Sequence, residues 1–269
     1  MQNLFPYDSY DTPDERRQCI ADRMLFNSRA YFYFHNFLVF VRTGMCAKKG
    51  LLSADKQVFY SNMNINLVER CGGKIHIRGL DNINKLQGRA AVLMGNHMSL
   101  LETALFHAII RPRIDFTFVI KESLLDVPFF GNIMRALGAI PVTRTNPKED
   151  FKQVLKLGRE TLAAGRSIIL FPQSTRSSQF NPENFNSIGV KLAKSAGVPI
   201  LPFALKTDFI GNGKILRDMG PIHRNRAVCF TFGEPIEVAG NGKEELQQVI
   251  SFIQNNLEQW RKIYPEKQN

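Results

Sequence analysis

The amino-acid sequence predicts an α/β fold, a mostly parallel sheet flanked by helices, with a helical segment ahead of it. From residue 90 onward, short apolar runs of strand length alternate with longer segments of helical periodicity. This alternation is typical of parallel sheets, because each strand is joined to the next by a helix that covers the sheet. The 269 residues, 44% of them hydrophobic, suffice for one large domain. We expect a helical attachment over residues 1–72 and the α/β domain over residues 73–269.

The N-terminal attachment holds two expected helices. The first, over residues 30–41, is dense in aromatic rings and too short to span a membrane. Polar or basic residues fall on one arc of this helix or follow soon after it: Arg29, His35, Asn36, Arg42, Lys48, Lys49 and Lys56. Such a helix can lie at a membrane surface, with its cations near lipid phosphates, or it can pack on the protein's own core. One helix can also do both, with one face on the core and the other at the membrane. The second helix, 53–70, ends before Gly72-Gly73.

The α/β domain follows from the order of its apolar runs. Expected strands are 74–78, 90–94, 116–120, 139–142, 167–171, 199–205 and 228–232, and expected helices are 100–110, 128–138, 147–164, 188–196 and 243–262. Helix 147–164 has the clearest ends, with Asn146 as its cap, Pro147 at its first position and Gly165 beyond its last turn.

Charge and cysteine usage restrict the class of protein. The net charge of +11 favours nucleic acid, anionic lipid or an acidic carrier as a partner, and charge alone does not choose among them. No run reaches the roughly 18 apolar residues of a spanning helix, and the acidic stretch 7–15 does not have the pattern of a signal peptide. The four cysteines stand far apart, which argues against a zinc site or a disulfide framework. We expect reduced thiols, no metal and a cytoplasmic location.

A polar cluster follows the strand 90–94, at a strand end where α/β proteins commonly place their sites. It reads Gly95-Asn96-His97-Met98-Ser99-Leu100-Leu101-Glu102. On one continuous helix His97 and Glu102 would point about 140° apart. Ser99-x-x-Glu102 is a capping box, however, which predicts a helix starting at Leu100, with His97 in the preceding loop and the Glu102 carboxylate aimed back toward it. The cluster makes His97 a candidate base, although Glu102 has the alternative of a purely capping role.

A second cluster follows the strand 167–171 and is rich in hydroxyl groups around one arginine. It reads Phe171-Pro172-Gln173-Ser174-Thr175-Arg176-Ser177-Ser178. A guanidinium beside backbone N–H groups and hydroxyls is suited to a phosphate, which it binds with charge-assisted hydrogen bonds. On its own, the segment is equally consistent with a solvated loop that carries an exposed arginine.

Two further segments complete the set, Lys121 through Arg144 and Val198-Pro199-Ile200-Leu201-Pro202. In this order and at these separations the four segments resemble the blocks of the glycerolphosphate and lysophospholipid acyltransferase family. Those blocks are Asn-His-x-x-x-x-Asp, a lysine-to-arginine segment ending in an apolar strand, Phe-Pro-Glu-Gly-Thr-Arg-Ser, and a Val-Pro-Ile-x-Pro strand. The resemblance covers roughly residues 75–235.

The resemblance implies a membrane-associated enzyme that transfers a fatty acyl group to a lysophospholipid hydroxyl. It assigns His97 as the general base and Glu102 as the group that orients and charge-stabilises its imidazole. Substrate-binding residues carried over from the blocks are Asn96, Lys121, Arg144, Gln173, Ser174, Thr175 and Arg176. The implied acyl donor is acyl-coenzyme A or acyl carrier protein, with no metal or other cofactor. The first expected acceptor is 1-acylglycerol 3-phosphate, which gives phosphatidate.

The chain departs from the family pattern at two places. Glu102 stands where an aspartate is usual, and the turn ahead of the helix can absorb the added methylene. Gln173-Ser174 stands where Glu-Gly is usual, in a block linked to the acceptor. A neutral amide both donates and accepts hydrogen bonds, so we expect Gln173 to influence which lysolipid is chosen. A lyso-form of another polar lipid is therefore a competing acceptor.

Two rival functions follow from the same residues. A lipid-binding protein that kept the fold and lost turnover is the rival suggested by the altered third block, although His97 and Glu102 argue against it. A nucleic-acid-binding protein would interleave aromatic and basic residues on an exposed platform. Because the basic residues fall instead within the four blocks and near the helix 30–41, we expect an anionic membrane surface as the partner and no nucleic acid. The expected location is peripheral, at the cytoplasmic face of a membrane.

Overall fold

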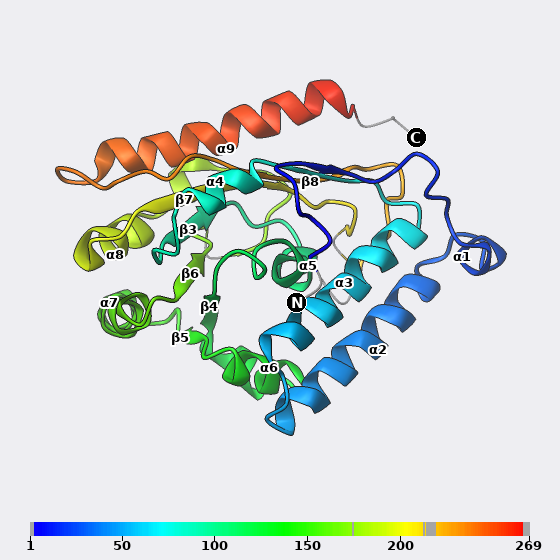
Figure 1. Ribbon diagram of the computed structural model, residues 1–269, viewed down its shortest axis with the longest axis horizontal. Coiled ribbons are helices and arrows are strands. Elements are labelled where there is room, and N and C mark those ends of the chain that lie inside the picture. The colour runs from blue at the N-terminus through cyan, green and yellow to red at the C-terminus, as the bar shows by residue number, and fades with distance from the viewer. Residues whose placement is uncertain (1–2, 174, 212, 214–218, 266–269) are drawn as a thin grey trace.

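A computed structural model describes residues 3–173, 175–211, 213 and 219–265, and these form one eight-stranded sheet between two layers of helices (Figure 1). The strand order is β1-β2-β8-β7-β3-β6-β4-β5. The strands are β1 (Tyr10–Asp11), β2 (Ile75–Arg78), β3 (Val92–Gly95), β4 (Phe116–Lys121), β5 (Ile140–Val142), β6 (Ser167–Leu170), β7 (Ile200–Lys206) and β8 (Val228–Phe232). The pairs β1/β2 and β7/β8 are antiparallel and the other neighbours are parallel. The predicted α/β fold class is confirmed.

The helices agree closely with the helical patterns of the sequence. They are α1 (Ile20–Met24), α2 (Arg29–Lys48), α3 (Ala54–Arg70), α4 (Leu80–Asn84), α5 (Leu101–Ile109), α6 (Phe130–Ala136), α7 (Pro147–Ala163), α8 (Ile188–Ala196) and α9 (Lys243–Ile263), with short 3-10 turns at Glu122–Asp126 and Pro182–Asn184. The predicted cap of α7 is present, because the Asn146 side chain accepts a hydrogen bond from the Glu149 N–H. The sequence missed α1, α4 and β1, which are too short to show a periodicity.

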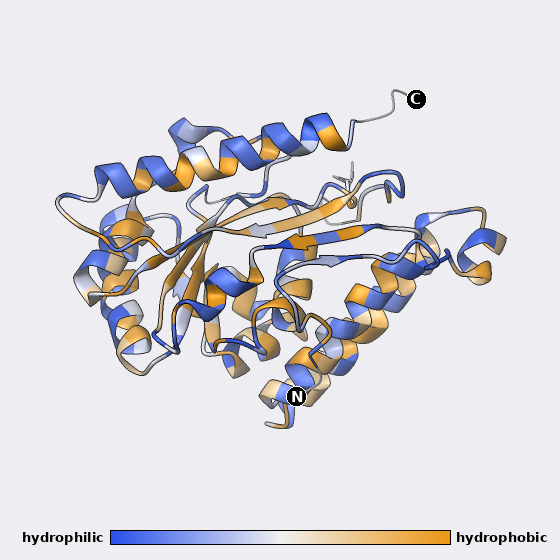
Figure 2. Ribbon diagram, turned by 45° about the horizontal axis from the view of Figure 1, so that its top comes forward, coloured by the Kyte–Doolittle hydropathy of each residue, from blue (hydrophilic) through white to orange (hydrophobic). Residues whose placement is uncertain are grey.

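Two apolar clusters, one on each face of the sheet, hold the helices in place. Successive side chains of a strand point to opposite faces, so Val92 and Met94 of β3 pack with α7, α8 and α9, whereas Leu93 packs with α3 and α5. The central strands are accordingly coloured as hydrophobic in Figure 2. Both faces are covered, which explains why the strands are nearly continuous apolar runs.

Helix α2 contains the aromatic segment 30–41, runs through Gly44 to Lys48 and ends ahead of Gly50, whose φ is +67°. Its inward face carries Tyr31 and Phe32, which belong to the core, while Phe34 and Phe37 are 61% and 57% exposed. One side of this segment is therefore core, as one of the two interpretations of the sequence expected. In the described part of the chain, the helices fall short of the length and hydropathy that crossing a membrane requires.

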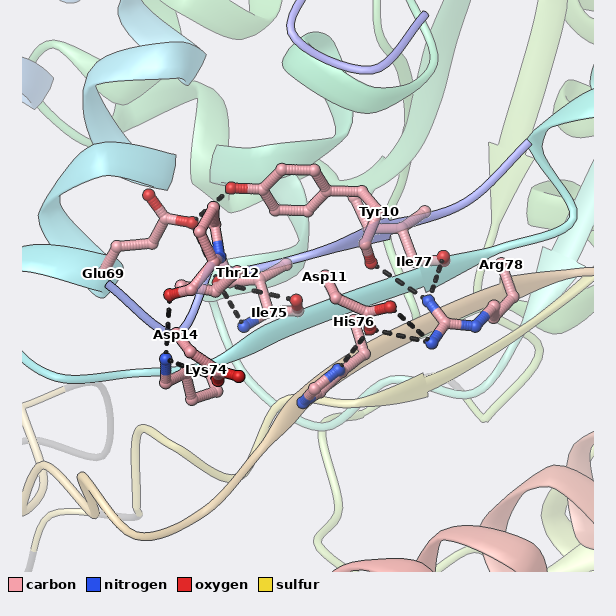
Figure 3. Close-up of polar contacts among 11 residues, drawn as sticks. Tyr10, Asp11, Thr12, Asp14, Glu69, Lys74, Ile75, His76, Ile77 and Arg78 are labelled. Atoms are coloured by element: carbon pink, nitrogen blue, oxygen red, sulfur yellow. Dashed lines mark hydrogen bonds and ion pairs between the residues drawn. The ribbon is translucent and has the colours of Figure 1, made fainter. Parts of the chain in front are cut away.

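The N-terminal strand β1 joins the sheet through polar contacts (Figure 3). Asp11 accepts two hydrogen bonds from the Arg78 guanidinium, at 2.7 and 2.9 Å, and forms an ion pair with His76. Thr12 and Tyr10 both donate to the buried Glu69 carboxylate of α3, at 2.8 and 2.6 Å. The segment before residue 73 thus contributes a strand to the sheet and anchors α3 beside it.

Candidate active site

Residues of three of the four sequence blocks meet at the carboxyl ends of the parallel strands, and the fourth block, 198–202, forms the start of β7. Strands β7, β3, β6, β4 and β5 are neighbours in that order and run parallel, so the loops after their carboxyl ends lie side by side. The loop after β3 carries His97, that after β6 carries residues 171–178, and Lys121 ends β4. Segments more than 70 residues apart in the sequence therefore share one site.

His97 and Glu102 form a hydrogen-bonded pair at this edge. The Nδ1 atom of His97 bonds to Oε2 of Glu102, and the carboxylate is fully buried while the imidazole is 16% exposed. Helix α5 starts at Leu101, one residue later than the capping box predicted, and leaves His97 in the preceding loop as expected. Because Nδ1 faces the carboxylate, Nε2 is the ring nitrogen left to exchange a proton.

A set of donors holds the Glu102 carboxylate. Its Oε1 atom accepts hydrogen bonds from the backbone N–H groups of Met98 and Ser99, at 2.9 and 2.7 Å, and from the Thr207 hydroxyl. The Ser99 hydroxyl donates to Thr207 at 3.0 Å and accepts from the Leu101 N–H at 3.1 Å. These donors compensate a buried negative charge, which is costly when unpaired. The capping and orienting roles of Glu102 therefore coexist.

Neighbouring loops fix the backbone and ring of His97. Its N–H donates to Oε1 of Gln173 at 2.9 Å, and its carbonyl accepts from the Ser177 N–H at 2.9 Å. The imidazole stacks on Phe171, with the ring centroids 4.0 Å apart and the planes inclined by 17°. Gly95 lets the Phe203 ring approach the end of β3, because a Cβ atom there would lie 2.1 Å from that ring.

The sequence predicts substrate contacts for Asn96 and Gln173, but in the structure both side chains bond to the protein itself. The Asn96 side chain is buried and bonds to both the carbonyl and the N–H of Leu205, each at 2.8 Å, so it ties the ends of β3 and β7 together. Gln173 is also buried, behind the His97 loop. The geometry favours positioning roles for both residues. Ser174, also predicted to bind substrate, lies outside the described residues.

The remaining predicted binding residues line one cavity together with His97. Its volume is about 1050 Å³, and Lys121, Arg144, Thr175, Arg176 and Lys191 contribute to its wall near the sheet edge. Farther in, β4 and α6 supply apolar side chains such as Phe118, Ile120, Phe130, Ile133 and Met134. A cavity with cations on one part of its wall and apolar side chains on another fits an amphiphile that has an anionic group.

Arg144 is held in an uncommon backbone conformation, with φ of +62°. The N–H groups of Thr143 and Arg144 both donate to the Asp150 carboxylate at 2.7 Å, which stabilises this turn. Burial alone would raise the pKa of Asp150, but these backbone donors and the Thr143 hydroxyl outweigh it and lower the pKa. Burial lowers the pKa of the Arg144 guanidinium; Asp150 opposes this shift and the nearby Arg176 adds to it. Two guanidinium groups are thus brought close to one another beside the cavity.

The arrangement supports proton transfer and anion binding at adjacent points. An imidazole oriented by a buried carboxylate can accept a proton from a hydroxyl that attacks an acyl carbon. Among the described residues, no three His, Cys, Asp or Glu side chains are grouped to hold a metal ion.

Sequence patterns missed two residues that shape this site. Thr207 follows the strand predicted to end at Leu205, and the rule that sites gather at strand ends would have included it. Phe171 was noted only as part of its block, although its ring carries the His97 imidazole. No local pattern marks the role of Phe171.

This geometry places a paired imidazole and carboxylate beside a cavity with basic and apolar walls, on an α/β scaffold. The family model described as Acyltransferase matches residues 74–206 of this chain. A 1-acyl-sn-glycerol-3-phosphate acyltransferase of Pseudomonas aeruginosa is 35% identical over 133 residues, 49% of this chain and 49% of that protein. The protein of the same name from Haemophilus influenzae is 25% identical over 206 residues, 74% of this chain and 82% of that protein.

A solved structure supports the fold. The 1-acyl-sn-glycerophosphate acyltransferase PlsC of Thermotoga maritima superposes with a TM-score of 0.65 and 20% identity, covering 93% of this chain and 99% of that one. The chain spans about half the length of the Pseudomonas relative that it matches.

Proposed function

We propose that this protein transfers a fatty acyl group to the free hydroxyl of a lysophospholipid, with 1-acylglycerol 3-phosphate as the acceptor and phosphatidate as the product. The observation that carries the proposal is the buried Glu102 carboxylate bonded to His97 beside a cavity that has basic and apolar walls. The names of the relatives from Pseudomonas and Haemophilus point to the same acceptor.

In the proposed reaction, Nε2 of His97 takes the proton of the acceptor hydroxyl as its oxygen attacks the carbonyl carbon of an acyl thioester. The new ester C–O bond forms, the thioester C–S bond breaks, and the proton passes from the imidazole to the departing thiolate. Glu102 keeps Nδ1 protonated and stabilises the transient imidazolium charge. No acyl-enzyme is required.

The cations of the cavity wall are the proposed phosphate site. Arg144 and Arg176 lie close together, and Thr175 and Lys121 line the same wall. A guanidinium group binds two phosphate oxygens at once, and this fixes where the acceptor's hydroxyl lies relative to His97. The proposed donor is acyl-coenzyme A or acyl carrier protein, since both are acidic and the net charge of +11 would attract either one.

The proposed location is the cytoplasmic face of a membrane, where a lysophospholipid acceptor can meet a water-soluble acyl donor. Helix α2 exposes Phe34, Phe37 and Met45 along its outer face, beside the exposed cations Arg42 and Lys48. Apolar side chains next to cations are typical of a helix that lies in an anionic lipid surface. The four free cysteines agree with a reducing compartment.

The reaction is tested by transfer of radiolabelled acyl groups from acyl-coenzyme A and acyl carrier protein to a panel of lysolipids. We expect the wild type to acylate 1-acylglycerol 3-phosphate and His97→Ala to lose the product while remaining folded by circular dichroism. If the wild type prefers another lysolipid, that lysolipid replaces 1-acylglycerol 3-phosphate as the acceptor. If no pair of donor and acceptor gives a product although lysolipids bind tightly, the protein binds lipids and does not transfer acyl groups.

Membrane association is tested separately by sedimentation with anionic liposomes. We expect Phe34→Ser with Phe37→Ser to reduce the bound fraction and to leave the melting temperature nearly unchanged. The matched control is Gln254→Ser with Gln259→Ser on the exposed face of α9, which we expect to change neither quantity. Equal binding of both double variants would contradict the assignment of α2 as the membrane contact.

A further inference from the structure

Helix α7 presents a row of cations to solvent. Because successive residues of a helix turn by about 100°, four exposed basic residues of α7 fall within an arc of about 80°. We call these four residues the basic stripe: Lys148, Lys152, Lys156 and Arg159. Among the described residues, Lys152 alone of the four forms an ion pair, with Glu149 at 2.9 Å, and both partners of that pair are exposed. The stripe therefore keeps most of its positive charge for a partner outside the chain.

The stability of the helix does not explain the stripe. Lys148, Lys152 and Lys156 are four residues apart, and like charges at this spacing repel one another. Lys148 also lies in the first turn of α7, where the helix dipole disfavours a cation. On α9, by contrast, Lys262 pairs with Glu258 one turn earlier, at 2.8 Å. The arrangement on α7 is one that an anionic partner would stabilise.

The stripe begins where the cavity opens to the surface. Residues that line the cavity and are also exposed mark this opening, and they include Arg144, Thr175 and Lys191. Arg144 lies one turn before Lys148 in the sequence. The Lys191 ammonium lies 5.3 Å from the centroid of the Phe151 ring of α7, so α8 brings a further cation to the same place. The stripe thus starts beside an opening of the cavity that holds the proposed active site.

The surface around the stripe does not have the character of a membrane contact. A helix that lies in a lipid surface exposes apolar side chains next to its cations. Within the described part of the chain, no large hydrophobic side chain of α7 or α8 is exposed, whereas α1, α2 and α3 expose several. Helices α7 and α8 lie at the left of Figure 1, and α1 and α2 lie at the right. The stripe therefore fits a water-soluble acidic partner better than a membrane.

The length of the stripe indicates a partner of protein size. Lys148 and Arg159 are 11 residues apart, which is about 17 Å along the helix axis. A typical protein interface covers about 800 Å² of each partner, a patch roughly 30 Å across, so the whole stripe falls within one interface. A small donor such as coenzyme A would meet the cations around the opening, Arg144 and Lys191, and would not need cations two or three turns farther along α7.

We propose that the basic stripe is the docking surface for an acidic carrier protein, which presents the acyl group as a thioester on a flexible arm. The arm enters the cavity at the opening beside Arg144 and Lys191, and the body of the carrier rests on α7. The inference rests on the proposed acyl transfer and specifies its donor. Complementary charge of this kind accelerates association and fixes the orientation of the partner.

The test compares two donors of the same chain, hexadecanoyl-acyl carrier protein and hexadecanoyl-coenzyme A, with 1-acylglycerol 3-phosphate as the acceptor. The stripe variant combines Lys152→Gln, Lys156→Gln and Arg159→Gln. None of these residues lines the cavity, and glutamine has nearly the same helix propensity. We expect kcat/KM for the carrier protein to fall by about tenfold, the range of three exposed ion pairs. We expect kcat/KM for the coenzyme A donor to change by less than about twofold, because salt screens charges outside the cavity.

A control variant removes the same number of charges elsewhere on the surface. It combines Lys85→Gln, Arg261→Gln and Lys262→Gln, all at exposed positions. We expect it to keep kcat/KM for both donors within about twofold of the wild type. Added salt should lower kcat/KM of the wild type for the carrier protein toward that of the stripe variant, since it screens the same attraction.

The outcomes separate this inference from the proposed reaction. A wild type that uses only the coenzyme A donor, or a stripe variant that loses equally with both donors or with neither, would overturn the docking surface and leave the acyltransferase intact. Loss of anionic liposome binding in the stripe variant would make the stripe a membrane contact and overturn the inference as well.

If neither donor gives a product, the proposed reaction fails, and docking is then measured directly. Fluorescently labelled acyl carrier protein is titrated with the wild type and with the stripe variant, and the change in anisotropy reports binding. Weaker binding to the stripe variant than to the control variant would still support the docking surface. Equal binding to both would overturn it.

Discussion

Two histidines ten residues apart, His97 and His107, line the same cavity in contrasting surroundings. Both rings stack on a phenylalanine, His97 on Phe171 with centroids 4.0 Å apart and His107 on Phe116 at 4.7 Å. The Nδ1 atom of His97 bonds to a buried carboxylate, whereas that of His107 is unpaired. Burial lowers the pKa of His107 to about 3, and the charges of Arg111 and Arg166 contribute.

The difference shows what makes a histidine suited to proton transfer. A buried imidazole without an anion stays neutral, because desolvation and nearby cations disfavour its charged form. A carboxylate at Nδ1 fixes the tautomer and compensates the positive charge that develops when Nε2 accepts a proton. A lone histidine in the sequence therefore says little about its chemistry until its partner is known.

The largest effect is expected on kcat when the carboxylate that pairs with His97 is removed. Glu102→Gln keeps the shape of the side chain and an oxygen to accept from Met98 and Ser99, but removes the charge beside Nδ1. We expect kcat to fall by about a thousandfold, within the usual range for general acid–base catalysis. Glu102→Asp keeps the charge and should retain more activity than Glu102→Gln. Equal activity of the wild type and Glu102→Gln in the labelled transfer assay would refute the pairing role.

The second prediction concerns the pH dependence of stability, which His107 should influence. The folded pKa of about 3 lies below the ordinary value of 6.5, so at intermediate pH the unfolded chain binds a proton that the folded chain does not. Stability present above pH 6.5 is therefore lost as the pH falls from 6.5 toward 3, at about 1.4 kcal/mol per pH unit. Lowering the pH from 7 to 5 should cost the wild type roughly 2 kcal/mol more than His107→Phe.

Urea unfolding at both pH values measures this difference. The His76→Phe variant is the control, because His76 is partly exposed and pairs with Asp11 of the outermost strand, β1. An identical loss of stability for the wild type and His107→Phe would show that His107 is not held neutral in the folded protein.

A smaller effect is expected at Thr207, which supports the carboxylate of the pair. Thr207→Val keeps the volume of the side chain but removes the hydroxyl that donates to Glu102 and accepts from Ser99. We expect kcat to fall by about tenfold to a hundredfold, the range of one net hydrogen bond to a charged group. A kcat unchanged from that of the wild type would mean that the two backbone donors suffice to orient Glu102.

The smallest effect is expected for Gln173→Glu. Its Oε1 atom accepts from the His97 N–H, and a glutamate oxygen can accept in the same way. We expect kcat to change by less than about threefold, since the bond that fixes the loop is kept. If Gln173 sets acceptor choice, as its departure from the family pattern suggested, the ranking of lysolipids in competition will change. An unchanged ranking would leave Gln173 with a positioning role alone.

Much of the architecture followed from local patterns. Strand-length apolar runs located six of the eight strands, since burial on both faces requires nearly continuous apolar residues, and the alternation over 74–78 located β2. Ser99-x-x-Glu102 located the turn that aims Glu102 back at His97, because a capping box is specified within four residues. The boundary between residues 72 and 73 stays a prediction.

The tertiary structure decided which groups complete the site. Thr207 reaches Glu102 across 105 residues, and Asn96 reaches Leu205 across 109. These contacts depend on β7 lying beside β3, which no local periodicity specifies. Likewise, the sequence could not say which side of α2 faces the core, because both sides carry aromatic rings. The sequence by itself determined the elements and the pair formed by His97 and Glu102. The order of the strands and the packing of the helices decided which bonds support this pair, which face of α2 is exposed and which side chains line the cavity. These features join residues that are distant along the chain.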